Sequence, residues 1–356
     1  MELTKEEQKA LNGEMGETLQ TAYRILLATG EATNAEKLIP IKWAHLSGVN
    51  YNTIGDSGEE FLRELSKDAR VKVKATVNPM GIDFDHISEF EHIDDEFIKK
   101  QASIRDSYIR MGVEPTFSCT PYDIFDLPEK NTQVSFAESN AAIFANSLGG
   151  LKTNKESAFS ALASAITGKS PYSDLRKDDI TIPMTIRMKM DNPNELDFGM
   201  LGFFAGKVGD TSVNISGVSQ PNRRSCKALC GGMGTSGTCA KFQFIDDTEG
   251  DKSEKIDFGK EEMNEVYDEL NTAEKGDLIT LGSPQLGLEE ISDLSKMLHG
   301  KSFQKRCMIF CSRAVQEQAR NLNYTNEIER AGGEILSDCC TCLTPLIDTN
   351  ETDAVT

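Results

Sequence analysis

The sequence predicts an α/β protein built from parallel sheets and divided into two or three lobes. The main observation is an alternation of strands and helices over residues 278–345, in which the strands read DLITL, CMIFC and EILS. Strands joined by helices in this way lie parallel, with right-handed crossovers. The length of 356 residues exceeds what one compact core usually takes, and no low-complexity linker marks a boundary between lobes. Apolar residues alternate over 180–188, which predicts another strand with one wet face.

The elements before residue 178 follow from periodicity and capping patterns. Thr4 and Glu7 form a capping box, and apolar residues at helical spacing extend the opening helix through residue 26. A second box, Ser135 with Glu138, opens a helix that ends at a Gly-Gly pair. Between these helices we expect a strand over 38–41, a helix over 57–66, a strand over 71–77, a helix over 95–111 and a loop over 117–128.

Charge and composition narrow the class of partner. The net charge is −19, whereas proteins that bind nucleic acid or anionic membranes carry clustered Lys and Arg. No apolar run approaches the ~18 residues of a membrane span, and the acidic, amphipathic N-terminus is not a secretory signal. We therefore expect a cytoplasmic protein with no nucleic-acid or membrane partner. A small anionic substrate is still compatible, because a local pocket can oppose the global field.

The nine cysteines are unlike a disulfide framework, since the expected compartment is reducing. Cys226, Cys230 and Cys239 have the most conspicuous spacing. The first two lie one turn apart in a small-residue helix, and the second pair that a structural zinc site needs is missing. Packing in the core is favoured over metal binding for these three.

Another set of cysteines follows the predicted parallel strands. Cys311 ends the strand CMIFC, and Cys339, Cys340 and Cys342 come just after EILS. Ligand sites of parallel α/β sheets form at the carboxyl ends of strands, so these residues are expected to share a crevice. Cys119 lies in the loop SCTPY, an unusual place for a core residue. Three such cysteines could hold an iron–sulfur cluster with one open iron, or they could be unrelated buried thiols.

Seven ordered blocks resemble the catalytic subunit of the aconitase X family. They are LIPIKWAHLSGVNY, KATVNPMG, SCTPY, FAESNAAIFANS, ALCGGMGTSG, MIFCSRAV and GGEILSDCCTCLTPL. The resemblance implies an aconitase-like body that eliminates water from a hydroxy acid. It is greatest to the archaeal branch, which dehydrates phosphomevalonate for isoprenoid synthesis. The bacterial branch, which dehydrates cis-3-hydroxyproline, is the alternative.

The resemblance also implies particular site residues. The cluster, 4Fe–4S with 2Fe–2S or mononuclear iron as alternatives, would be held by Cys119, Cys311 and Cys340, with Cys342 as an alternative to Cys340. The substrate would contact Gly48, Val49, Asn50, Asn78, Pro79, Glu138 and Ser139. Backbone amides beside glycine and in a first helical turn can approach an anionic oxygen closely. The simpler interpretations are ordinary turns at Gly48 and Asn78, and a helix cap at Glu138.

The sequence also departs from the family. Lys152 stands where an arginine is expected, 172–175 lacks a histidine, and the substrate-binding Thr-Asn-Ser-x-Lys segment of relatives has no counterpart before residue 356. These departures favour a further alternative, a non-catalytic or degenerate cluster-binding subunit. None of the four histidines is a convincing base, and only His45 lies in a family block. In aconitase-like enzymes the base is a serine on a swivelling domain. We therefore expect this chain to lack that domain and to pair with a small subunit of ~100–150 residues that supplies it.

Overall fold

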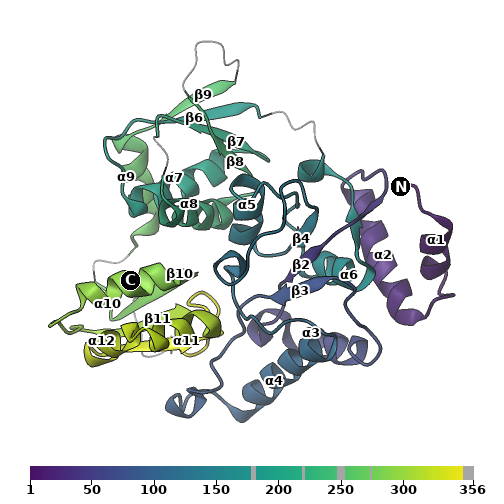
Figure 1. Ribbon diagram of the computed structural model, residues 1–356, viewed down its shortest axis with the longest axis horizontal. Helices are drawn as coiled ribbons and strands as arrows, with labels where there is room; N and C mark the ends of the chain where they lie inside the picture. The colour runs from purple at the N-terminus through teal and green to yellow at the C-terminus, as the bar shows by residue number, and fades with distance from the viewer. Residues whose placement is uncertain (178–181, 219–220, 247–252, 273–274, 348–356) are drawn as a thin grey trace. The chain divides into compact units, whose positions relative to one another are not determined.

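The computed structural model describes residues 1–177, 182–218, 221–246, 253–272 and 275–347 (Figure 1). They form two compact units. Unit 1 comprises residues 1–44 and 127–272, and unit 2 comprises residues 45–126 and 273–356. Each unit therefore combines two separate stretches of sequence.

Unit 2 contains the sheet that the strand–helix alternation predicted. Its strands are β10 (Leu278–Leu286), β11 (Arg306–Cys311) and β12 (Gly333–Ser337). They run parallel in the order β10-β11-β12, and Ile309 pairs with Leu281 on one side and Ile335 on the other. The connecting helices are α10 (Leu288–Met297), α11 (Arg313–Asn321) and α12 (Tyr324–Arg330). The predicted parallel arrangement is confirmed.

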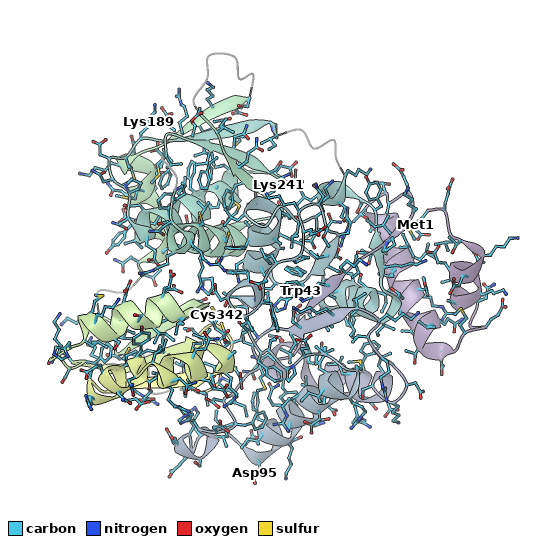
Figure 2. The ribbon with its side chains drawn as sticks, viewed as in Figure 1. Met1, Trp43, Asp95, Lys189, Lys241 and Cys342 are labelled. Atoms are coloured by element: carbon cyan, nitrogen blue, oxygen red, sulfur yellow. The ribbon has the colours of Figure 1, made fainter. Side chains whose placement is uncertain are left out.

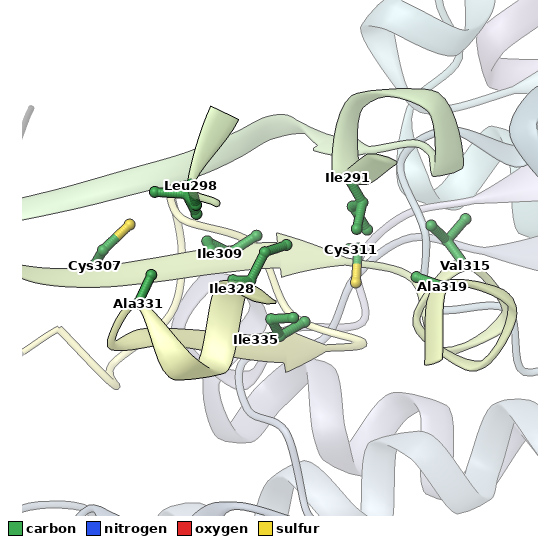
Figure 3. Packing of buried hydrophobic residues seen from close by; sticks show 10 residues of the cluster. All are labelled: Ile291, Leu298, Cys307, Ile309, Cys311, Val315, Ala319, Ile328, Ala331 and Ile335. Carbon is green, nitrogen blue, oxygen red and sulfur yellow. The ribbon is translucent and has the colours of Figure 1, made fainter. Parts of the chain in front are cut away.

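Both faces of β11 are buried, which explains why CMIFC is apolar throughout. Cys307, Ile309 and Cys311 alternate along one face and pack with residues of α10, α11 and α12 (Figure 3). Met308 and Phe310 point to the opposite face and pack against apolar residues of 82–97. Each large apolar side chain buried in this way contributes ~1.5–3 kcal/mol. The sheet is therefore a rigid support for the residues at its carboxyl end.

The first stretch of unit 2 covers the opposite face of that sheet. It contains β2 (Trp43–Leu46), β3 (Lys74–Val77), α3 (Tyr51–Leu65), α4 (Asp95–Arg110) and the 3-10 turns η1 (Ile87–Glu89) and η2 (Pro121–Asp123). The first two residues of β2 are counted with unit 1. Asn50 caps α3 through its side chain, and Gly55 interrupts the helical backbone with a φ of 58°. The predicted helix over 57–66 is therefore the part of α3 after this break. The loop from 117 carries Cys119 and is buried, with Phe117, Ser118, Cys119 and Thr120 each at most 5% exposed.

Unit 1 contains a four-stranded parallel sheet with strand order β8-β7-β6-β9. These strands are β6 (Met184–Met188), β7 (Val213–Ser216), β8 (Phe242–Phe244) and β9 (Glu254–Phe258), with helices α7 (Glu195–Val208), α8 (Arg223–Ser236) and α9 (Lys260–Leu270). Helices α7 and α8 approach very closely, because a Cβ atom at Gly202 would lie 2.2 Å from the carbonyl oxygen of Leu229. Cys226 and Cys230 are buried on α8, in agreement with core packing.

The rest of unit 1 is built from its first 44 residues and 127–177. It comprises α1 (Lys5–Leu11), α2 (Glu17–Ala32), β1 (Leu38–Pro40), β4 (Val134–Phe136), α5 (Ser139–Ser147), α6 (Ala158–Thr167), β5 (Lys169–Pro171) and the 3-10 turn η3 (Asp174–Arg176). Strands β1 and β5 pair antiparallel.

Three local predictions were wrong or only partly correct. The opening helix is two helices, because Gly13 and Gly16 have φ values of 87° and 97° and break it. Ser135 does not cap a helix, since it lies in β4 and Glu138 is the N-cap of α5. The strand expected over 180–188 is observed from Met184, and its first two residues lie outside the described part of the chain.

Candidate active site

The predicted cysteine segments of unit 2 converge on Gln285, a residue of β10 that is fully buried. Its backbone N–H donates to Cys119 Sγ at 3.2 Å. Its side-chain amide donates to the carbonyl oxygens of Phe117 at 3.3 Å, Cys311 at 3.3 Å and Cys339 at 2.9 Å. One glutamine therefore connects the loop of Cys119 with the carboxyl ends of two neighbouring strands.

Three thiols interact around the loop that follows β12. The Cys340 thiol hydrogen-bonds to that of Cys342 and interacts electrostatically with that of Cys119. The Cys342 sulfur lies 3.1 Å from the hydroxyl of Ser283. The hydrogen bond between the two cysteines raises the pKa of Cys340 and lowers the pKa of Cys342 to about 6. Cys342 is therefore the more acidic of the pair, and Cys340 retains the proton.

Cys311 contributes its backbone carbonyl to this region, while its side chain packs among apolar residues. The thiol is fully buried in the cluster formed with Ile291, Val315 and Ala319 (Figure 3). In the part of the chain that the structure describes, no three His, Cys, Asp or Glu side chains are arranged to hold a metal ion. The segments of Cys119, Cys311 and Cys340 are thus brought together, but their sulfur atoms are not arranged as a set of three ligands.

An arginine links the two strand ends that carry cysteines. Arg313, which follows Cys311 by two positions, donates from Nε to Asp338 Oδ2 at 2.7 Å and also bonds to Asp83 and Asp85. The carboxylate of Asp83 accepts in turn from the backbone N–H of Ser337 at 2.8 Å. Burial raises the pKa of Asp338 to about 6, while the adjacent guanidinium opposes this rise.

The predicted substrate residues of unit 2 lie against the loop after β12. The side chain of Asn50 donates to the carbonyl oxygen of Leu343 at 2.9 Å. The residue after Pro79, Met80, donates its N–H to the carbonyl oxygen of Asp338 at 2.8 Å. Gly48 has a φ of 78°, which favours glycine, and the carbonyl of Val49 accepts from Gln101. Both predicted substrate loops therefore lie beside the predicted cysteine loop.

His45 is a buried neutral histidine rather than an accessible base. Its Nδ1 lies 2.7 Å from Thr76 Oγ1, and it also bonds to the side chain of Asn78 and the backbone of Ser118. Burial lowers its pKa to about 3, although the bonds to Asn78 and Ser118 oppose this. It fixes the residue before Cys119 and the predicted substrate residue Asn78.

Glu138 and Ser139 belong to unit 1. The carboxylate of Glu138 accepts from the N–H of Asn140 at 3.3 Å and from its side-chain amide at 2.8 Å. This is the N-cap that the simpler interpretation anticipated. Nearby, burial lowers the pKa of Lys155, which interacts with Glu138.

Sequence reasoning missed the residues that assemble the site. Gln285 and Arg313 organise it, but neither was among the predicted site residues. The one available signal for Gln285 was a polar residue directly after a Ser-Pro pair in an otherwise apolar segment. Asp83 gives no such signal, because acidic residues are abundant around it.

Comparison with known proteins gives one consistent relationship. Family models described as the first, second and third domains of aconitase X match residues 1–178, 183–268 and 276–356. The phosphomevalonate dehydratase large subunit of Methanocaldococcus jannaschii is 38% identical, with 98% of this chain and 91% of the relative covered. The corresponding protein of Thermococcus kodakarensis is 35% identical, with 97% and 90% covered. The cis-3-hydroxy-L-proline dehydratase of Pseudomonas aeruginosa is 28% identical over 95% of this chain and 61% of the relative.

The structures agree with the sequences. The crystal structure of Thermococcus kodakaraensis aconitase X in its holo-form superposes with a TM-score of 0.89 at 35% identity, covering 97% of this chain and 90% of that one. The predicted aconitase-like α/β fold is thereby confirmed. Among the described helices, none has the length and apolar character that crossing a membrane requires. The chain belongs to the aconitase X family.

Proposed function

We propose that this chain is the large subunit of a hydro-lyase that dehydrates (R)-5-phosphomevalonate to an anhydrophosphomevalonate in the mevalonate pathway. Four archaeal relatives at 33–38% identity are named phosphomevalonate dehydratase large subunits. The two relatives named cis-3-hydroxy-L-proline dehydratases are less similar, at 27–28% identity. Dehydration of hydroxyproline is therefore the second candidate.

The observation that carries the proposal is the convergence of the cysteine segments on Gln285. It supports an iron–sulfur cluster, 4Fe–4S with one iron free of protein, with Cys119, Cys311 and Cys340 as ligands. Two of the three donors fit such a cluster, because the thiols of Cys119 and Cys340 interact and an amide N–H is directed at Cys119. The thiol of Cys311 would have to turn out of its apolar contacts to join them. Cys342 is the alternative to Cys340. When bound, the open iron would act as a Lewis acid on the substrate hydroxyl.

The residues of the chain itself would bind and orient the substrate. Backbone amides beside Gly48, whose positive φ lets the loop turn sharply, are suited to an anionic oxygen. Asn50 and Asn78 are held by the carbonyl of Leu343 and by His45. Two substrate loops fixed in this way would hold a phosphorylated hydroxy acid beside the cysteine loop. Glu138 and Ser139 of unit 1 stay predicted substrate residues.

The base is proposed to come from a partner. The relatives are named large subunits, which implies a small subunit. In this chain the one histidine in a family block, His45, is fully buried, and its Nδ1 lies 2.7 Å from Thr76 Oγ1. We propose that the small subunit is a swivelling domain that closes over the substrate and removes the proton from the carbon next to the leaving hydroxyl.

The cluster proposal is tested by anaerobic purification of single cysteine variants, with iron and sulfide counted per chain. The changes C119A, C311A and C340A are expected to abolish the cluster. C226A is the control, since Cys226 is a buried thiol on α8 of unit 1. Loss of iron in C342A with retention in C311A or C340A would show that the ligand set is wrong. Loss in C226A alone would reject the cysteine site of unit 2.

The substrate proposal is tested with the cluster-loaded chain, assayed with and without its co-expressed small subunit. Phosphomevalonate is expected to be dehydrated only when both subunits are present. Turnover of cis-3-hydroxyproline alone would establish the second candidate. Full activity without the small subunit would show that the base lies in this chain. A stable cluster without turnover of either substrate would favour a non-catalytic subunit.

A further inference from the structure

We infer that Gln285 is the positioning residue of the cysteine site, holding the segments of Cys119, Cys311 and Cys339 in register for the cofactor. The inference deepens the proposed function and rests on it for the identity of the cofactor. Gln285 itself would not bind iron, because its contacts are to backbone carbonyls and to one thiol. Its effect would be exerted through the cysteines.

The local backbone explains how a β10 residue reaches the site. The pairing of β10 with β11 shifts register between Leu281 and Leu286, and Gln285 lies inside this irregular part. Gly282 makes the irregularity possible, with a φ of 116° and no room for a Cβ atom beside the Phe310 carbonyl. Within this irregular part, the backbone N–H of Gln285 is directed at Cys119.

The hydrogen bonds of Gln285 join segments that nothing in the local sequence holds together. Phe117, Cys311 and Cys339 are 168, 26 and 54 residues from Gln285 along the chain. Because Gln285 is fully buried, removing its amide leaves these carbonyls without that donor and without replacement by bulk water. The backbone N–H directed at Cys119 would additionally stabilise the thiolate that a metal requires.

Gln316 provides a matched control on the same sheet. It lies in α11, is 4% exposed, and donates one side-chain hydrogen bond to the carbonyl of Ile335 at 3.2 Å. Both residues are thus buried glutamines of unit 2. Gln316 bonds to the strand β12, and Gln285 bonds to the ends of β11 and β12. Only Gln285 connects the cysteine segments, so a general effect of losing a buried glutamine would appear equally in both.

The experiment compares Q285M and Q285E with Q316M and Q316E. Methionine has about the volume of glutamine but no hydrogen-bond donor. Glutamate has the shape of glutamine, but its carboxylate oxygens would repel the carbonyl oxygens that the amide of Gln285 contacts. After anaerobic reconstitution, cluster loss to a chelator is expected to be at least ten-fold faster in Q285M than in wild type, and within two-fold of wild type in Q316M. The urea midpoint of each variant is measured alongside. Equal acceleration in both methionine variants would overturn the inference, because it would indicate a merely structural role.

A second measurement needs no cofactor. Cys119 is 5% exposed. Its alkylation by iodoacetamide in protein prepared without metal, followed by peptide mass spectrometry, therefore reports the integrity of the site. We expect at least ten-fold faster alkylation of Cys119 in Q285M, or in Q285E if Q285M does not fold, and no change in the Gln316 variants. Unchanged alkylation would overturn the inference. Faster alkylation of Cys119 in Q285M, together with a wild type that takes up no cluster on reconstitution, would reject the proposed cofactor and leave the positioning role intact.

Discussion

His45 makes the stability of this protein dependent on pH in a way that can be calculated. Its pKa falls from an ordinary 6.5 to about 3 because the imidazole is fully buried. As the pH drops below 6.5, the unfolded chain binds a proton that the folded chain does not, so stability is lost on acidification. The loss is about 1.4 kcal/mol per pH unit until the pH approaches the folded pKa of about 3. Between pH 7 and pH 5 it amounts to about 2 kcal/mol.

The measurement is urea unfolding of wild type and H45Q at both pH values, followed by the fluorescence of Trp43. Trp43 is the single tryptophan and lies on β2 together with His45, so it reports unfolding of this strand (Figure 2). Wild type should lose about 2 kcal/mol more than H45Q between pH 7 and pH 5. H299Q is the control, because the side chain of His299 is 83% exposed. An identical loss in wild type and H45Q would refute the assignment of His45 as a buried neutral residue.

Two further substitutions test the framework of the site by urea unfolding. D83A should lower the free energy of unfolding by about 3 kcal/mol, because it removes the buried carboxylate that Arg313 and Ser337 share. D85A removes an exposed carboxylate and should lower the free energy of unfolding by less than about 1 kcal/mol. Equal losses of stability would show that the bonds of Asp83 contribute no more than the exposed bond of Asp85. G282A should cost about 3 kcal/mol, because its Cβ atom would lie 2.3 Å from the Phe310 carbonyl oxygen. Gly300 has a φ of 70° and open space around it, so G300A should lower the free energy of unfolding by about 1 kcal/mol. An equally small loss in G282A would contradict the close approach of Gly282 to the Phe310 carbonyl.

The parts of the fold that sequence predicted well are those that short-range patterns determine. The three strands of the sheet β10-β11-β12 begin within one residue of their predicted positions, because buried parallel strands have a distinct apolar pattern. Helix α12 was not predicted. The capping box of Thr4 and Glu7 is observed as predicted. The box of Ser135 and Glu138 fits the same pattern and is absent, because Ser135 is taken up by β4. A four-residue pattern cannot distinguish these cases.

The candidate site was predictable only where strand ends determine position. The rule that parallel strands end on one edge correctly brought the segments of Cys311 and Cys340 together. The residues that join these segments could not be predicted, since Gln285 acts across a register shift and Arg313 pairs with aspartates more than 220 residues earlier in the sequence. Such contacts depend on tertiary packing, and no local periodicity encodes them.

The side chain of Cys311 shows why strand position alone does not determine a ligand. Strand residues alternate between faces, so Cys311 shares a face with Cys307 and Ile309 and packs among apolar residues. Cofactor binding would require its thiol to leave that cluster. Removing a side chain of this size from apolar contact costs on the order of 1 kcal/mol, and a rotamer change costs about as much again. Thiolate–metal sites contribute on the order of 10 kcal/mol over their ligands, so the gain from one ligand exceeds this cost. The apolar packing of Cys311 is therefore compatible with its proposed role, and a C311A variant that keeps the full iron and sulfide content would contradict that role.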